Sequence, residues 1–406
     1  MNDTYASHVL RIYLLLLSGS DLGSDVKSKR SKKYKSNHKI SKISVGSRKV
    51  SDKFLDILHQ ITKSIMKSLK LNQDIVKELA FNQNANPVLQ ILLKNEKFSQ
   101  SMVKLLVKNA DVEFLNQLIH DSVGSHLMEK VLGVVSTDLY KSLYRMVFKN
   151  HLIELAEHPV ANFVVQRLIE FVPREKTLLK IIKELSPCFS SFIHQNRIGL
   201  LSMIAKACLP WENLQEIFMN HLVQSLGADI PTKSLIFQVL FNSNTYVEYR
   251  KPNLQGSLLV QHLVKYKSTL VTVILNGIYS LDPTSLKKWA VDPILSRIIS
   301  SFLESNLLFK MKKKLVLSFR GSLSYLAKDR IGSRVLDQLW LVSDIHTREL
   351  FLKELLESEV ELLNDFYGKF ILSKAHWDLY KKRRDEWMTL SMRVENRKSL
   401  FAEFTK

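Results

Sequence analysis

A short residue pattern recurs along almost the whole chain and constrains its fold more than any other feature. In each instance a small residue precedes two variable residues, two mostly apolar residues and one mostly polar residue, and we number these positions zero to five. Position one falls at residues 7, 86, 125, 162, 200, 257, 293, 333 and 369. Six of the eight intervals measure 36–40 residues, and the other two measure 79 and 57. A fixed period of this length is typical of repeat proteins.

Helical geometry gives the pattern a structural meaning. At 100° per residue, positions one, two and five share one helix face, whereas positions three and four point away from it. We therefore expect each motif to form a short helix that buries its middle pair against neighbouring repeats and presents three side chains outward. A unit of 36–40 residues has room for about three short helices. Because glycine (12) and proline (9) are also scarce, we predict an all-α solenoid of three-helix repeats.

The two long intervals predict insertions. The first spans residues 20–50, and its segment 27–49 contains ten lysines and arginines and no acidic residue, so we expect a disordered loop. This loop either contacts phosphates, directs nuclear import or is simply solvated. The second insertion spans residues 227–252, and its apolar run 235–241 is expected to lie against the solenoid.

The two ends of the repeat array differ. We assign residues 1–379 to a solenoid with nine visible repeats and residues 380–406 to a terminal capping helix with a basic tail. Trp377, Tyr380, Arg384 and Trp387 have the i, i+3/i+4 spacing expected of such a helix. Met1 lies just before the first motif, so we expect that repeats upstream of it are missing from this chain.

Composition restricts the class of partner. The net charge of +20 and the pI near 9.7 favour a polyanion, because neutralising phosphates releases counterions. The two cysteines cannot form a disulfide framework, and without a neighbouring histidine pair we expect no structural zinc. No run approaches the roughly 20 apolar residues of a membrane span. We expect a soluble, intracellular, monomeric protein without a membrane partner.

The triplets at positions one, two and five resemble those of a known repeat family. Asn162-Phe163-x-x-Gln166, Ser125-His126-x-x-Glu129 and Ser257-Leu258-x-x-Gln261 are similar to pumilio (PUF) repeats, in which these positions contact RNA bases. The wider chain resembles the nucleolar protein nine family within that class. The segments that carry this resemblance are Ser7–Arg11 followed by Leu14–Leu17, the basic insertion, Asn162–Leu168, the later insertion, Gly332–Asp337 and Tyr380–Trp387.

The resemblance implies a fold, a ligand and a location. The fold would be a right-handed superhelix of pumilio-like repeats. The protein would bind pre-rRNA near the 3′ end of the small-subunit rRNA, help to time its processing, and work in the nucleolus of the nucleus beside proteins of the pre-ribosomal particle. The RNA-binding residues would be Ser7, His8, Arg11, Asn86, Gln90, Ser125, His126, Glu129, Asn162, Phe163, Gln166, Ser257, Gln261, Ser333, Arg334 and Asp337.

The same resemblance assigns bases to the intact pairs. It implies uracil for Asn162/Gln166 and Asn86/Gln90, guanine for Ser125/Glu129 and adenine for Ser257/Gln261. Two motifs depart from the family pattern and should not read a base by the usual pairing, namely Leu200/Leu201/Ile204 and Pro293/Ile294/Arg297. Pro87 at the stacking position and the triplet Lys369/Phe370/Ser373 are also irregular.

Two alternatives remain open, a pumilio-type regulator of mRNA and a HEAT- or armadillo-like protein-binding scaffold. Catalysis is not indicated, because the sequence has no phosphate-cradling Gly-rich loop, HExxH, GxSxG or CxxC pair. His120, Asp121 and His126 are close in sequence but lack a third metal ligand. We therefore expect a binding protein rather than an enzyme, with no cofactor and no metal.

Overall fold

The computed structural model describes residues 1–19, 50–71, 73–108, 110–227, 229–305 and 307–392, and every regular element among them is a helix. This confirms the predicted all-α repeat fold. The basic segment 27–49 and the end of the tail, 393–406, lie outside the described residues. The chain divides into two compact units, residues 1–185 and 186–406.

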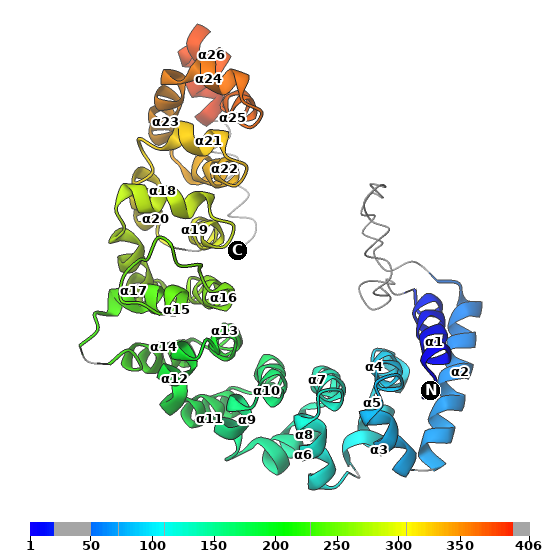
Figure 1. Cartoon of the computed structure of the whole chain (residues 1–406). Helices are drawn as coiled ribbons and strands as arrows, with labels where there is room; N and C mark the ends of the chain where they lie inside the picture. The colour runs from blue at the N-terminus through cyan, green and yellow to red at the C-terminus, as the bar shows by residue number, and fades with distance from the viewer. Residues whose placement is uncertain (20–49, 72, 109, 228, 306, 393–406) are drawn as a thin grey trace. The chain divides into compact units, whose positions relative to one another are not determined.

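The first unit contains four motif helices, α1 (Thr4–Leu17), α4 (Asn86–Leu93), α7 (Gly124–Val134) and α10 (Ala161–Glu170). Each contacts the next, so that they form a continuous row (Figure 1). The other elements of this unit lie between or after the motif helices in the chain. These are α2 (Asp52–Leu71), α3 (Gln73–Phe81), α5 (Glu96–Val103), α6 (Val112–His120), α8 (Thr137–Leu143), α9 (Leu152–Glu157), α11 (Glu175–Leu185) and the π-helical turns η3 (Lys104–Lys108) and η4 (Tyr144–Phe148).

The second unit contains five motif helices, α13 (Ile198–Ala207), α16 (Leu254–Leu263), α19 (Leu295–Glu304), α22 (Gly332–Val342) and α25 (Gly368–Lys374). They also contact one another in chain order (Figure 1). The other elements are η5 (Ser186–Cys188), α12 (Phe189–His194), α14 (Glu212–Gln224), η6 (Thr232–Ser234), α15 (Leu235–Phe241), α17 (Ser268–Tyr279), α18 (Pro283–Val291), α20 (Phe309–Leu317), α21 (Leu323–Lys328), α23 (Ile345–Glu357), α24 (Glu359–Asn364) and α26 (Trp377–Lys382).

The middle pair of the motif forms the core between helices. Val164 and Val165 in α10 and Leu127 and Met128 in α7 are fully buried, as the period predicts. The prediction is wrong for α1, where Val9 is 65% exposed. Among the described helices, α1 has a row neighbour only on its α4 side, so its other side meets solvent.

A three-residue turn starts most motif helices. In α7 the Asp121 Oδ1 accepts hydrogen bonds from the backbone N–H groups of Val123 and Gly124, at 2.9 and 2.7 Å. Asp292, Asp329 and Asp365 do the same before α19, α22 and α25. These side chains satisfy backbone donors that a helix start leaves unpaired. The turn therefore determines where each motif helix begins.

The small residue at position zero is required by the preceding helix. A Cβ at Gly332 or Gly368 would lie 2.8 Å from the carbonyl oxygen of Leu326 or Leu362, respectively. At Gly256 the approach is closer, 2.0 Å from the carbonyl oxygen of Val239 in α15. The backbones of the two helices touch here, so that a larger residue must push them apart.

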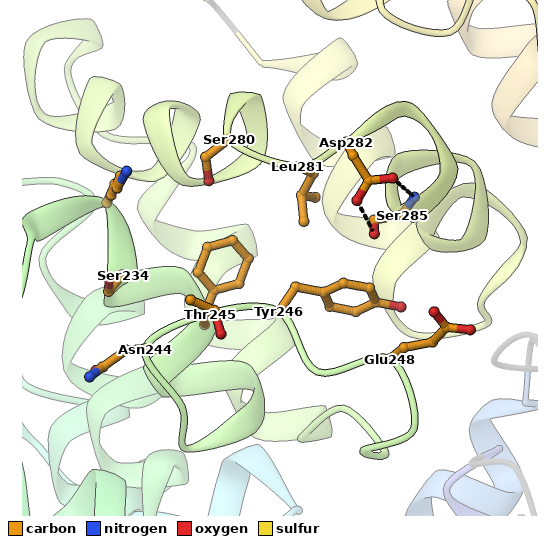
Figure 2. A pocket seen from close by; sticks show the side chains of 11 residues that line it. Ser234, Asn244, Thr245, Tyr246, Glu248, Ser280, Leu281, Asp282 and Ser285 are labelled. Atoms are coloured by element: carbon orange, nitrogen blue, oxygen red, sulfur yellow. Dashed lines mark hydrogen bonds between the residues drawn. The ribbon is translucent and has the colours of Figure 1, made fainter.

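The predicted insertion 227–252 contains a helix of the repeat. All seven residues of α15 are buried. In chain order α15 comes between α14 and α16, and it contacts α16, just as α12 comes between α11 and α13 and contacts α13. The extra length is confined to the connection 242–253, whose Tyr246 ring contacts Phe241 and Trp289. Figure 2 shows Tyr246 and Glu248 lining a pocket of about 440 Å³ together with Asp282. The prediction of an insertion is thus wrong for residues 235–241.

The end of the second unit is closed by the helix at residues 384–392. Trp387 is 1% exposed, and its Nε1–H donates to the Ala375 carbonyl at 2.8 Å. Glu349 of α23 accepts hydrogen bonds from Arg384 at 2.8 Å and from the Tyr380 hydroxyl at 3.1 Å. These contacts join α23 to the terminal helices.

We predict that Gly256→Ala destabilises the second unit. The added methyl meets a backbone oxygen that cannot rotate away, so unfolding should become easier by about 1–3 kcal/mol, as for other overpacked sites. Gly133→Ala in α7 is the control, because its Cβ would meet only the Phe171 ring at 3.4 Å. Urea unfolding followed by circular dichroism measures both. Equal stability of Gly256→Ala and the wild type would contradict the close approach.

We also predict an acid-sensitive contribution from Glu349. Its hydrogen bond with Arg384, aided by those with Tyr380 and Lys353, lowers its pKa from 4.5 to about 2. Because the folded pKa is the lower one, this stability is present above pH 4.5 and is lost as the pH falls toward 2. Glu349→Gln should therefore reduce unfolding free energy by roughly 1.5–3 kcal/mol at pH 7, and by much less near pH 2.5. Urea titrations across pH test this, with the exposed Glu357→Gln as control; a pH-independent deficit would refute it.

Candidate nucleic-acid interface

The turn geometry corrects the register of one motif. Asp292 caps the backbone N–H groups of Ile294 and Leu295, so Leu295 stands where Gly124 and Gly332 stand in their helices. Position one of α19 is therefore Ser296, three residues later than the sequence pattern indicated. Positions two and five become Arg297, which is exposed, and Ser300, which is half-buried. Pro293, Ile294 and Arg297 therefore do not form an outward-facing triplet.

Position one is mostly buried, which contradicts the expectation that it faces outward. Its side chains are at most 8% exposed in five of the predicted RNA-binding helices. These residues are Ser7, Asn86, Ser125, Ser257 and Ser333. The Ser257 hydroxyl, for example, donates to the Ile294 carbonyl in the turn before the next motif helix, a partner that the geometry of one isolated helix cannot predict. Asn162 in α10 is the exception and is half-buried.

In three helices position one holds the amide at position five. Gln90 Nε2 donates to Asn86 Oδ1 at 2.7 Å, and Gln166 Nε2 donates to Asn162 Oδ1 at 3.2 Å. Gln261 Nε2 donates to Ser257 Oγ at 3.0 Å. All three glutamines are half-buried, so they remain accessible from solvent. Position one thus orients position five, which presents the accessible polar group.

The residues at position one are themselves anchored. Asn86 Nδ2 donates to the Ala80 carbonyl at 2.5 Å, and Asn162 Nδ2 donates to the His158 and Pro159 carbonyls at 2.9 and 2.8 Å. Ser257 Oγ donates to the carbonyl of Ile294, in the turn before α19, at 3.2 Å. Each anchor ties the triplet to a turn or a preceding helix.

In α7, α10, α19 and α22 position two carries a flat side chain that reaches solvent, whereas α4 and α16 have Pro87 and Leu258 there. Phe163 is 54% exposed and the His126 side chain is 65% exposed. Arg297 and Arg334 are exposed as well. Aromatic rings and guanidinium planes are the groups on which nucleic-acid bases stack. His8 in α1 is half-buried, and Arg11 donates to its Nδ1 at 3.3 Å.

Carboxylates at position five are paired with cations of the next helix. Glu129 accepts a hydrogen bond from Arg167 of α10 at 3.3 Å, and it also contacts His126 Nδ1 at 3.3 Å. Asp337 is bridged to Lys374 of α25 at 2.9 Å. Arg167 and Lys374 both occupy position six, one residue beyond the recurring motif. A ligand that reads Glu129 or Asp337 therefore also meets a positive charge.

Position six of α16 behaves differently. His262 occupies it, and burial, then Lys265 and Lys206, lower its pKa to about 4. The ring is therefore neutral near pH 7 and cannot pair with a phosphate as a cation. Its neighbour at position five, Gln261, is the accessible polar group of this helix.

The signal that would have located Arg297 lies in the sequence. An aspartate three residues before position zero marks the helix start in Asp121, Asp329 and Asp365. Asp292 fits the same rule once Leu295 is accepted at position zero, although leucine is not a small residue.

In the part of the chain that the structure describes, no group of three or more His, Cys, Asp or Glu side chains could hold a metal ion. Nor is any described helix long and apolar enough to cross a membrane.

Comparison with known families gives one continuous match. The model described as a NOP9-like PUF repeat domain matches residues 1–370. The chain is 26% identical to Nucleolar protein 9 of Arthroderma gypseum over 98% of its own length and 62% of that protein. It is also 26% identical to Pumilio homolog 23 of Arabidopsis thaliana, over all of its length and 57% of that protein. The chain thus spans about three fifths of the curated relatives it matches.

Solved structures show the same fold. A structure of APUM23 with GGAAUUGACGG superposes with a TM-score of 0.79 at 25% identity, covering 96% of this chain and 75% of that chain. A structure of APUM23 with GGAGUUGACGG gives a TM-score of 0.80 at 23% identity, over 96% and 75%. The resemblance in sequence and the resemblance in fold point to the same repeat architecture.

Proposed function

Because the chain belongs to the NOP9-like PUF repeat family, we propose that it is an RNA-binding factor of ribosome assembly that acts in the nucleolus. Its RNA would be pre-rRNA near the 3′ end of the small-subunit rRNA, and its role would be to help time processing there. It would act by binding, as PUF repeat proteins generally do, and work beside proteins of the pre-ribosomal particle.

One structural observation carries the RNA-binding proposal. In α7, α10, α19 and α22 accessible side chains with chemistry suited to bases recur at positions two and five. Phe163 and Gln166 are the best example, because a stacking ring lies beside an amide that has both a donor and an acceptor. The net charge of +20 supplies attraction for phosphates.

The relatives support the proposal from another side. Those named Nucleolar protein 9 suggest the nucleolus, and APUM23 was solved with an oligonucleotide that contains uracil.

We assign direct base contact to His126, Glu129, Phe163, Gln166, Gln90, Gln261, Arg334 and Asp337, and at the first helix to His8 and Arg11. We add Arg297 and Ser300 of α19. Ser7, Asn86, Ser125, Asn162, Ser257 and Ser333 would orient these side chains from position one.

Crosslinking the chain to RNA in cells and sequencing the bound fragments tests the function. We expect fragments from pre-rRNA near the 3′ end of the small-subunit sequence. Fragments scattered over mRNA 3′ regions would instead indicate a pumilio-type regulator of mRNA. Recovery of no RNA above background would leave a protein-binding scaffold as the better interpretation.

We predict that Gln166→Ala weakens binding to the recovered RNA by about 1–3 kcal/mol, the range for a good base contact. Asn162→Ala should weaken it less, because Asn162 acts by holding Gln166. Fluorescence anisotropy measures both affinities, and Gln117→Ala, an exposed glutamine on α6, is the matched control. Unchanged affinity for Gln166→Ala would remove α10 from the base-contact set.

A further inference from the structure

An exposed aromatic cluster lies at the last motif helix of the second unit. Phe366 and Phe370 are 62% and 58% exposed, and their ring centroids are 5.6 Å apart with the planes at 77°. Tyr367 adds a third ring, 5.1 Å from that of Phe366. Exposed rings in contact with one another are costly in water, so a cluster of this kind indicates a binding surface.

A lysine sits over the cluster. Lys369 Nζ lies 5.3 Å from the centroid of Phe366 and 5.5 Å from that of Phe370. Among the described residues no carboxylate forms a salt bridge with it. Lys369 also occupies position one of the motif and Ser373 position five, so this helix has neither the acceptor nor the glutamine of the pairs in α4, α10 and α16. This helix therefore lacks the chemistry of a base-reading triplet.

The cluster continues the row of motif helices. Phe370 is at position two of α25, and α25 contacts α22, whose position two is Arg334. Phe366 stands in the turn, one residue after the capping Asp365. In the other capped three-residue turns and in the turn before α4 this place is taken by Gln83, Ser122, Pro159, Pro293 and Arg330. The large ring in the turn is thus specific to this repeat.

We propose that Phe366, Lys369 and Phe370 form a stacking platform that binds a nucleotide of single-stranded RNA without reading its base. The inference rests on the proposed function. Every base has a π face, so stacking on phenylalanine tolerates any sequence, and the ammonium group of Lys369 neutralises the adjoining phosphate. The platform would hold RNA that continues past the contact made by α22.

The occupant is RNA rather than a protein segment because of charge and position. Val360 and Leu363 of α24 extend the apolar surface, which a protein could also use. The cation is centred on the two phenylalanine rings, however, and these rings adjoin the row that carries the stacking side chains. A protein partner is therefore the outcome that the experiment must separate from RNA.

The test uses the full chain and two fluorescein-labelled RNAs, a uridine 20-mer and a cytidine 20-mer. Fluorescence anisotropy at fixed salt should show that the double variant Phe366→Ala/Phe370→Ala binds both at least about fivefold more weakly than the wild type. Leu363→Ala is the matched control, since it removes exposed apolar surface but no ring, and its affinity should not change. Phe370→Trp should keep the wild-type affinity, and RNA should quench its tryptophan emission more than that of the wild type, which has five tryptophans.

Each contrary result has a definite meaning. Equal affinity of the double variant and the wild type would overturn the platform and favour a protein partner. A loss for one homopolymer only would show base reading, and an equal loss in Leu363→Ala would show a general apolar effect; either overturns the proposal. If the wild type binds the crosslinked RNA but neither homopolymer, the platform fails alone. If it binds none of the three RNAs, the proposed function fails as well.

Discussion

The contact between the start of a motif helix and the backbone of the preceding helix, seen at Gly256, Gly332 and Gly368, is the constraint on which much of the structure depends. A carbonyl oxygen such as that of Leu326 or Val239 approaches position zero too closely for a larger side chain. The capping aspartate in the adjoining turn fixes the residue at which the helix starts. Together they determine the rotation of the motif helix and thereby which side chains enter the core and which face solvent. A shift of one residue would rotate the helix by about 100° and move one residue of the buried pair toward solvent.

The parts of the fold that depend on local chemistry could be predicted from the sequence. Five of the twelve glycines stand at position zero, and their spacing gives the repeat length and the helical class. The buried middle pair follows from the same period, as Val164 and Val165 show. Both features are properties of one helix and its immediate neighbour, which is why a pattern of six residues was sufficient.

The parts that depend on neighbouring repeats could not be predicted. The Ser257 hydroxyl is buried and donates to the Ile294 carbonyl of the next repeat, and the six-residue motif does not contain that partner. The register of α19 was misplaced because Leu295 occupies a position where small residues were expected, and only the hydrogen bonds of Asp292 identify it. The run 235–241 resembled an insertion because the long connection after α15 hides its place in the repeat.

The bonds within the triplets have a consequence for affinity. In the free chain each glutamine at position five is already held by position one, at 2.7–3.2 Å. This bond uses one of the two N–H groups of the amide, so the second N–H and the carbonyl oxygen remain for a base edge. Binding then orders fewer side-chain rotamers, and the cost of orienting Gln166 is met on folding rather than on binding. Burial of position one and exposure of position five are therefore two parts of one arrangement. The buried side chain at position one holds the side chain at position five in the orientation in which it would meet RNA.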